Sequence, residues 1–180
     1  DTLTLKDRIS HHVATSMGTL EAISANKQDV VSNFRKYFND ASSNGVGKYK
    51  SYVIKTEGNE EAVMALKKTL DGVQIKYGFT ESRRKLNGFD YLTRKDGSFA
   101  VLETDLIISV KQPKGKLVKI LFEPETVLED SNTYDITTWS LPYAYGLKAF
   151  ATSSDLSVGS KNAAERTKME ILAQTPYAYL

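Results

Sequence analysis

The sequence has no cysteine and only two histidines, and these scarcities exclude several kinds of site. Without cysteine the chain has no disulfide, no thiolate metal ligand and no cysteine nucleophile. His11 and His12 are neighbours, so on a helix their side chains point about 100° apart and rarely bind one ion together. A zinc enzyme site needs about three protein ligands, and no His-x-x-Glu or His-x-x-x-His spacing occurs. The sequence therefore predicts no metal site and no cofactor in this chain.

Motifs for nucleophilic catalysis and phosphate binding are also missing. There is no Gly-x-Ser-x-Gly elbow. The glycine-rich segment at residues 45–48 precedes a predicted strand instead of following one, which is the wrong context for a dinucleotide loop. Residues 57–59 lie between a predicted strand and helix, where an anion could bind, but we interpret them as an ordinary turn. The acids of residues 123–130 leave a general-acid pair open, although nothing marks one.

Long apolar runs and a charge excess are absent too. No run of about 18 apolar residues occurs, so the sequence predicts no membrane-spanning segment. The 24 basic and 22 acidic residues give a formal net charge of +2. Basic clusters such as Arg83–Lys85 are short, whereas nucleic-acid-binding proteins show a clear basic excess. We therefore expect no nucleic-acid partner and interpret these clusters as solvated surface.

Residues 1–44 have the pattern of a helical segment. Thr4 and Asp7 have the spacing of a capping box that starts a helix. Apolar residues then recur at spacings of three and four, which places them in one stripe on a helix; they are Ile9, Val13, Met17, Leu20 and Ile23. A second apolar set follows, so residues 7–38 form one helix or two helices joined near residues 25–27. The stripe requires a surface that covers it.

Residues 45–180 change to a pattern of strands and helices. A strand at 50–55, a helix after Asn59 and a strand at 73–79 predict a βαβ unit, which implies parallel pairing. We therefore expect an α/β fold in which a layered, mostly parallel sheet with flanking helices follows the long N-terminal helical segment.

The remaining elements continue this pattern. Asp96–Gly97 is a hairpin turn signal between two short strands. A continuous apolar strand at 105–110 belongs at the buried centre of a sheet. Further predictions are a helix from 112 to 123, an aromatic turn or short helix at 134–142, a strand at 146–151 and a helix or exposed connector at 165–174.

An aromatic cluster is the one candidate binding surface in the sequence. Its members are Trp139, Pro142, Tyr143 and Tyr145. They could line a ligand groove or an interface, because aromatic residues are frequent there. They could equally form a core corner against the sheet, which is the interpretation we favour.

Four segments resemble a known family: residues 8–22, 51–59, 105–124 and 134–152. They are similar to the region after the catalytic domain in large secreted bacterial zinc carboxypeptidases of the carboxypeptidase A type. The resemblance implies that the chain to about Asn39 finishes or packs on that catalytic domain. It also implies a following amidotransferase-like or flavodoxin-like α/β domain and a periplasmic or secreted parent protein. The family's zinc ligands have no matching positions here, so the zinc belongs to the parent catalytic domain.

The sequence thus favours a non-catalytic accessory domain, with residues 1–44 as a helical segment and 45–180 as an α/β domain. Its expected partner is the catalytic domain of the parent or another copy of the chain. Both ends look cut, so we expect a fragment truncated at its C-terminus. Two alternatives stay open: an independent ligand- or peptide-binding module with a pocket near Glu57–Gly58 or Trp139, and a hydrolase with an unrecognised site.

Overall fold

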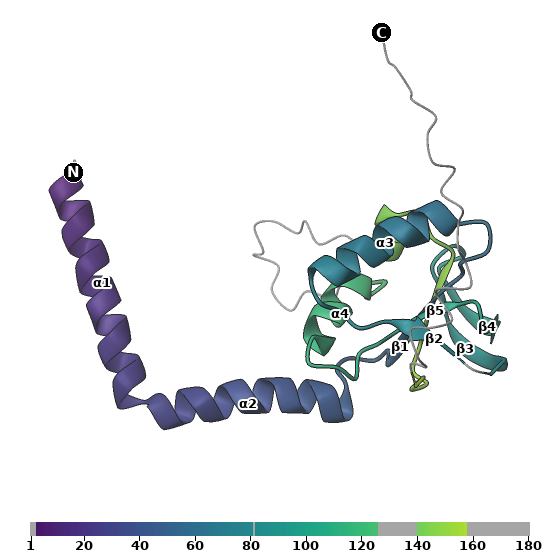
Figure 1. Ribbon diagram of the computed structural model, residues 1–180, viewed down its shortest axis with the longest axis horizontal. Coiled ribbons are helices and arrows are strands. Elements are labelled where there is room, and N and C mark those ends of the chain that lie inside the picture. The colour runs from purple at the N-terminus through teal and green to yellow at the C-terminus, as the bar shows by residue number, and fades with distance from the viewer. Residues whose placement is uncertain (1–2, 81, 126–139, 158–180) are drawn as a thin grey trace, which may run out of the picture. The chain divides into compact units, whose positions relative to one another are not determined.

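The computed structural model describes residues 3–80, 82–125 and 140–157 (Figure 1). The chain divides into two compact units, Asp1–Asp40 and Ala41–Leu180. The first unit is helical, and the second contains the sheet. Among the described residues, no helix is long and apolar enough to cross a membrane.

The N-terminal unit contains α1 (Leu5–Ala25) and most of α2 (Lys27–Asn44). The predicted capping box is confirmed: the Asp7 amide donates to Thr4 Oγ1 at 3.2 Å, and the Thr4 amide donates to Asp7 Oδ2 at 3.1 Å. The joint between the helices is Asn26, whose side-chain amide donates to the Ala22 carbonyl at 2.9 Å. Of the two arrangements predicted for this region, the pair of helices is therefore the one observed.

In the part of the second unit that the structure describes, one six-stranded sheet has the strand order β2-β5-β1-β6-β3-β4. All of its strand pairs are antiparallel. The strands are β1 (Ser51–Ile54), β2 (Gly78–Phe79), β3 (Arg84–Asp90), β4 (Lys95–Val101), β5 (Leu106–Ser109) and β6 (Ala149–Thr152). Besides the end of α2, the helices described in this unit are α3 (Glu60–Gly72), α4 (Gly115–Phe122) and α5 (Leu141–Ala144).

The predicted mostly parallel layered sheet is wrong, because every pair in this sheet is antiparallel. The reason lies in β5. Both β1 and β2 pair antiparallel with β5, so Ile54 and Phe79 each lie opposite Leu106. The two strands of the predicted βαβ unit consequently run in the same direction, but β5 separates them and they do not pair.

The hairpin of β3 and β4 is present, but its turn is not at Asp96–Gly97. Those residues lie inside β4 and pair with β3. The turn follows Asp90, whose side chain accepts a hydrogen bond from the Leu92 amide at 2.8 Å. The Asp90 carbonyl also accepts from the Arg94 amide at 2.8 Å, and Arg94 takes a positive φ of 55°. Local side-chain bonding of this kind defines turns as firmly as the Asp-Gly dipeptide does.

Other boundaries differ in detail. The strand predicted at 73–79 is reduced to Gly78–Phe79, since Gln74 adopts a φ of 58° directly after α3. The helix predicted to begin at 112 begins at Gly115, and Glu123 ends it as expected. Most of the predicted aromatic turn and the whole helix predicted at 165–174 lie outside the described residues.

The core lies on both faces of the sheet. The larger cluster is on the face that α3 and α4 cover (Figure 1), where Leu66 of α3 and Phe122 of α4 are fully buried with Tyr52 of β1. The smaller cluster contains Val53, Leu86, Phe99, Val101, Ile107, Phe150 and Leu156. Because alternate strand residues point to opposite faces, burial on both sides explains why β1, β5 and β6 are buried throughout.

Candidate functional site

The predicted aromatic surface is dispersed in the structure. Trp139 lies outside the described residues. Pro142 is buried in α5, and the Tyr145 hydroxyl lies 2.7 Å from Thr69 Oγ1 of α3. Tyr143 is 40% exposed, and its ring packs edge-on against Tyr91 at 5.1 Å. These contacts attach α5 to its neighbours, which is a structural role.

Two tyrosines of the larger apolar cluster, Tyr91 and Tyr52, have buried side chains. The Tyr91 hydroxyl donates to the Phe122 carbonyl, and the Tyr52 and Phe122 ring centroids are 5.3 Å apart. Burial raises the pKa of Tyr91 and that of Tyr52 well above the usual value. A phenol that keeps its proton at neutral pH does not act as a general base there.

The turn at residues 57–59 uses its own acid at the start of α3. The Gly58 amide donates to Glu60 Oε1 at 3.0 Å. Backbone hydrogen bonds from Glu60 and Gly58 lower the pKa of the Glu60 carboxyl. An internal carboxylate thus occupies the position that an external anion would take, in line with an ordinary strand-to-helix turn.

Metal-binding side chains do not gather in the described part of the chain. No group of three or more His, Asp or Glu residues is placed to hold an ion there. His11 and His12 are both exposed on α1.

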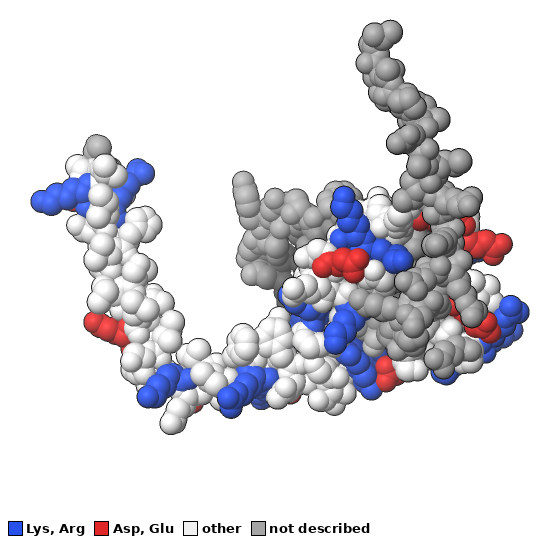
Figure 2. All heavy atoms as spheres, viewed as in Figure 1, with Lys and Arg blue, Asp and Glu red and all other residues white. Residues whose placement is uncertain are grey.

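Most of the exposed large apolar side chains among the described residues belong to the N-terminal unit. We call the residues Ile9, Val13, Met17, Leu20 and Ile23 the α1 stripe; each is 47–62% exposed, and α1 has no buried residue. Figure 2 shows α1 nearly free of charge, with Lys and Arg gathered near its N-terminal end. Residues 9–20 contain no Asp, Glu, Lys or Arg. On α2, the residues Val30, Val31, Phe34 and Tyr37 are also 45–65% exposed.

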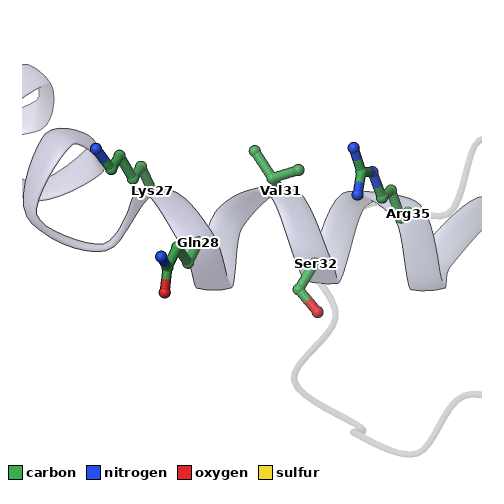
Figure 3. Close-up of a pocket in the computed structure, with 5 residues that line it drawn as sticks. All are labelled: Lys27, Gln28, Val31, Ser32 and Arg35. Atoms are coloured by element: carbon green, nitrogen blue, oxygen red, sulfur yellow. The ribbon is translucent and has the colours of Figure 1, made fainter.

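Two shallow grooves are lined entirely by described residues. One, of about 440 Å³, runs along α2 between Lys27 and Arg35, with Val31 between them (Figure 3). All of its lining side chains come from one helix, so no second element closes it. The other, also of about 440 Å³, lies along β3 and β4 and begins at Arg83–Lys85. Neither groove includes Glu57 or Gly58, where the sequence predicted a pocket, and the other predicted position, Trp139, lies outside the described residues.

The groove along β3 and β4 was missed at the level of sequence. From the sequence, the three consecutive basic residues Arg83–Lys85 are interpreted as solvated surface. The signal that could have drawn attention to it is their position at the start of a strand. Comparisons with protein-family models, curated proteins and solved structures find no match for this chain. The site must therefore be interpreted from its own geometry.

Proposed function

We propose that this chain is a non-catalytic accessory domain of a larger secreted zinc carboxypeptidase, and that its N-terminal unit docks on the catalytic domain. The α1 stripe is the observation that carries the proposal. The resemblance of four segments to that family supports the choice of parent protein. The zinc and the peptide-hydrolysing residues belong to that parent domain.

The exposure of the α1 stripe is costly unless another surface covers it. Burying one Val, Leu, Ile or Met side chain contributes about 1.5–3 kcal/mol. Isolated helices are only marginally stable in water, and most helical stability in proteins comes from packing an apolar face. A contiguous exposed apolar surface is typical of an interface. These terms together favour a partner for α1.

The chemistry around the stripe favours a folded domain over a second copy of the chain. Helices that pair as coiled coils usually flank their apolar seam with Glu and Lys, whose ion pairs select the partner. Residues 9–20 of α1 offer no such charges. A helix with this composition fits an apolar groove on a folded body, which selects it by shape.

The second unit fits the role of a separately folded platform. Its sheet is covered on both faces by apolar clusters. The buried side chain of Gln112 is bonded internally, since it joins the Lys76 backbone through hydrogen bonds of 2.7 and 2.9 Å. These bonds support a structural role for this unit.

Photocrosslinking in the full-length secreted protein tests the docking. A benzoylphenylalanine at position 13 or 20 should crosslink to the catalytic domain, identified by mass spectrometry of the joined peptides. The same probe at His11 or Ala22, on the other side of α1, is the matched control and should crosslink weakly. Crosslinks only between copies of the chain, or a monomer whose stripe gives none, would contradict the proposal.

A second measurement tests the absence of catalysis. The isolated chain, assayed for bound zinc by mass spectrometry and for hydrolysis of C-terminal peptide substrates, should show neither. The full-length protein, measured in parallel, should show both. One zinc per isolated chain together with turnover would mean that His11 and His12 belong to a site of its own.

A further inference from the structure

The groove along β3 and β4 lies at an open edge of the sheet. β4 is the last strand in the strand order, so its outer side has no strand partner among the described residues. The groove runs beside Ser98–Leu102 and is bordered by Arg83, Arg84 and Lys85. The unpaired N–H and C=O groups of such an edge are a template for another extended chain.

The basic border of this groove is not neutralised by the described residues. Arg83, Arg84 and Lys85 are all exposed, and the ion pairs of the described chain include none of them. The Arg84 Nε donates only to Ser82 Oγ, at 3.1 Å. Across the ladder, Arg84 lies opposite Val101 and Lys85 lies opposite Ala100, so no acid faces them. The groove therefore presents positive charge to whatever enters it.

The edge strand is held rigidly from its inner side. The Phe99 ring stacks on Phe150 with centroids 4.3 Å apart, and Val101 is fully buried. Lys55 Nζ donates to the Ala100 carbonyl at 2.6 Å. Asp105 bonds both the amide and the carbonyl of Leu102, so the backbone groups that remain for pairing are those of Lys95–Phe99. A preorganised edge loses little entropy when a partner binds.

We propose that this edge binds an extended peptide segment with acidic side chains, which pairs with β4 and sets carboxylates on its two faces against Arg84 and Lys85, whose side chains point to opposite faces of the sheet. Strand addition supplies main-chain hydrogen bonds, and neighbouring pockets supply the preference for side chains. Added strands lie about 4.8 Å from the edge, and the small side chain of Ala100 leaves Lys85 room to reach across. Long basic side chains on β3 can therefore contact the added strand.

The length of the groove favours a peptide over a small anion. The lining of the groove follows β4 for several residues, whereas phosphate or sulfate would need only a compact cluster of donors. The formal net charge of +2 does not favour a nucleic acid. The proposal does not depend on the docking of the N-terminal unit, because all of its residues belong to the second unit.

An NMR titration of the full chain at low salt tests the proposal. The probe is the blocked hexapeptide acetyl-Val-Thr-Glu-Glu-Thr-Val-amide, whose two adjacent Glu side chains point to the two faces of an extended strand. Amide shift changes should be confined to residues 83–85 and 95–102. The double variant Arg84→Gln with Lys85→Gln should weaken binding about tenfold, since charge-assisted hydrogen bonds are the stronger ones. Lys67→Gln with Lys68→Gln on α3 removes the same charge and should leave the affinity unchanged.

The controls decide between ligand classes. The peptide in which Gln replaces each Glu should bind at least about tenfold more weakly. Equal binding of both peptides would overturn the role of charge, and an absence of shifts at millimolar peptide would overturn the site itself. If inorganic phosphate or a sulfated polysaccharide produces the same shifts with the same dependence on Arg84 and Lys85, the site is one for anions and the peptide proposal fails. Amide spectra of the double variant verify that it remains folded.

Discussion

Lys55 Nζ lies 2.6 Å from Asp105 Oδ2 in a nearly buried ion pair, in which Lys55 is 16% exposed and Asp105 is 2% exposed. Each residue has a second role. Lys55 also donates to the Ala100 carbonyl, and Asp105 Oδ2 accepts from the Leu102 amide at 2.8 Å. The pair thereby connects the end of β1 to the link between β4 and β5. Lys55 Nζ also lies 6.0 Å from the ring centroid of Phe150, a member of the smaller apolar cluster.

Asp105→Ala is expected to lower the free energy of unfolding by about 3–5 kcal/mol, because it leaves the Lys55 ammonium buried without a counter-charge. Asp105→Asn should cost less, since its amide oxygen can still accept from the Leu102 backbone. Urea denaturation followed by circular dichroism measures both differences.

Lys111 and Asp155 provide the matched control. Their Nζ–Oδ2 distance is 2.5 Å, but the side chains are 38% and 45% exposed. Exposed pairs contribute about 0–1 kcal/mol, so Asp155→Ala should be nearly neutral. Equal losses for Asp155→Ala and Asp105→Ala would mean that burial does not determine the strength of the Lys55–Asp105 pair.

Features set by neighbouring residues could be predicted from the sequence. The Thr4–Asp7 capping box and the joint at Asn26 depend on side chains within four positions of each other. The Lys55–Asp105 pair joins residues 50 positions apart, so no local sequence pattern predicts it. The predicted parallel pairing of the strands was wrong for the same reason, because it depends on residues far apart in the sequence. Apolar alternation identifies a strand, but it does not say that β5 will enter between β1 and β2.

The hairpin shows two local signals in competition. Asp96–Gly97 has the composition of a turn, but the turn forms after Asp90, which accepts the hydrogen bonds that stabilise it. Moving the turn to Asp96–Gly97 would shift the register and take Gly88 away from its present position. The groove along β3 and β4 could not be predicted for a similar reason. The sequence contains the basic residues Arg83–Lys85, but only the strand order shows that an open sheet edge lies beside them.

Gly88→Ala is expected to destabilise the fold by about 1–3 kcal/mol through overpacking. A Cβ there would lie 2.4 Å from the Ala151 carbonyl oxygen of β6, and backbone atoms cannot move aside easily. Gly97 is the cross-strand partner of Gly88, and a Cβ on Gly97 meets nothing within 4 Å. Gly97→Ala should therefore change the melting temperature very little. Similar losses from both variants would contradict the register of β3 and β4.

Stability should fall at alkaline pH because three tyrosines keep their protons in the folded state. Burial raises the pKa of Tyr77 to about 12 and raises the pKa values of Tyr52 and Tyr91 further. An acid with a raised native pKa stabilises the fold fully below its unfolded pKa of about 10, and this contribution is lost as the pH rises toward the native value.

The expected loss is about 1.4 kcal/mol per tyrosine at pH 11, one unit above the unfolded pKa. Urea denaturation at pH 8, 10 and 11 gives the slope of stability against pH. Tyr77→Phe should make this slope shallower, whatever it does to stability at pH 8 through loss of its bonds to Asp71. A stability that is flat from pH 9 to pH 11 would show that these phenols ionise within the folded state.

The α1 stripe should determine how much apolar dye the isolated chain binds. Val13→Asp with Leu20→Asp places two carboxylates in the stripe and should strongly reduce the fluorescence of bound anilinonaphthalene sulfonate. Thr15→Asp with Ala22→Asp adds the same charge outside the stripe and should reduce it little. Neither change should alter the free energy of unfolding of the second unit by more than about 0.5 kcal/mol, because α1 has no buried residue. Equal loss of dye binding in both variants would indicate that helix stability, and not the stripe, controls the signal.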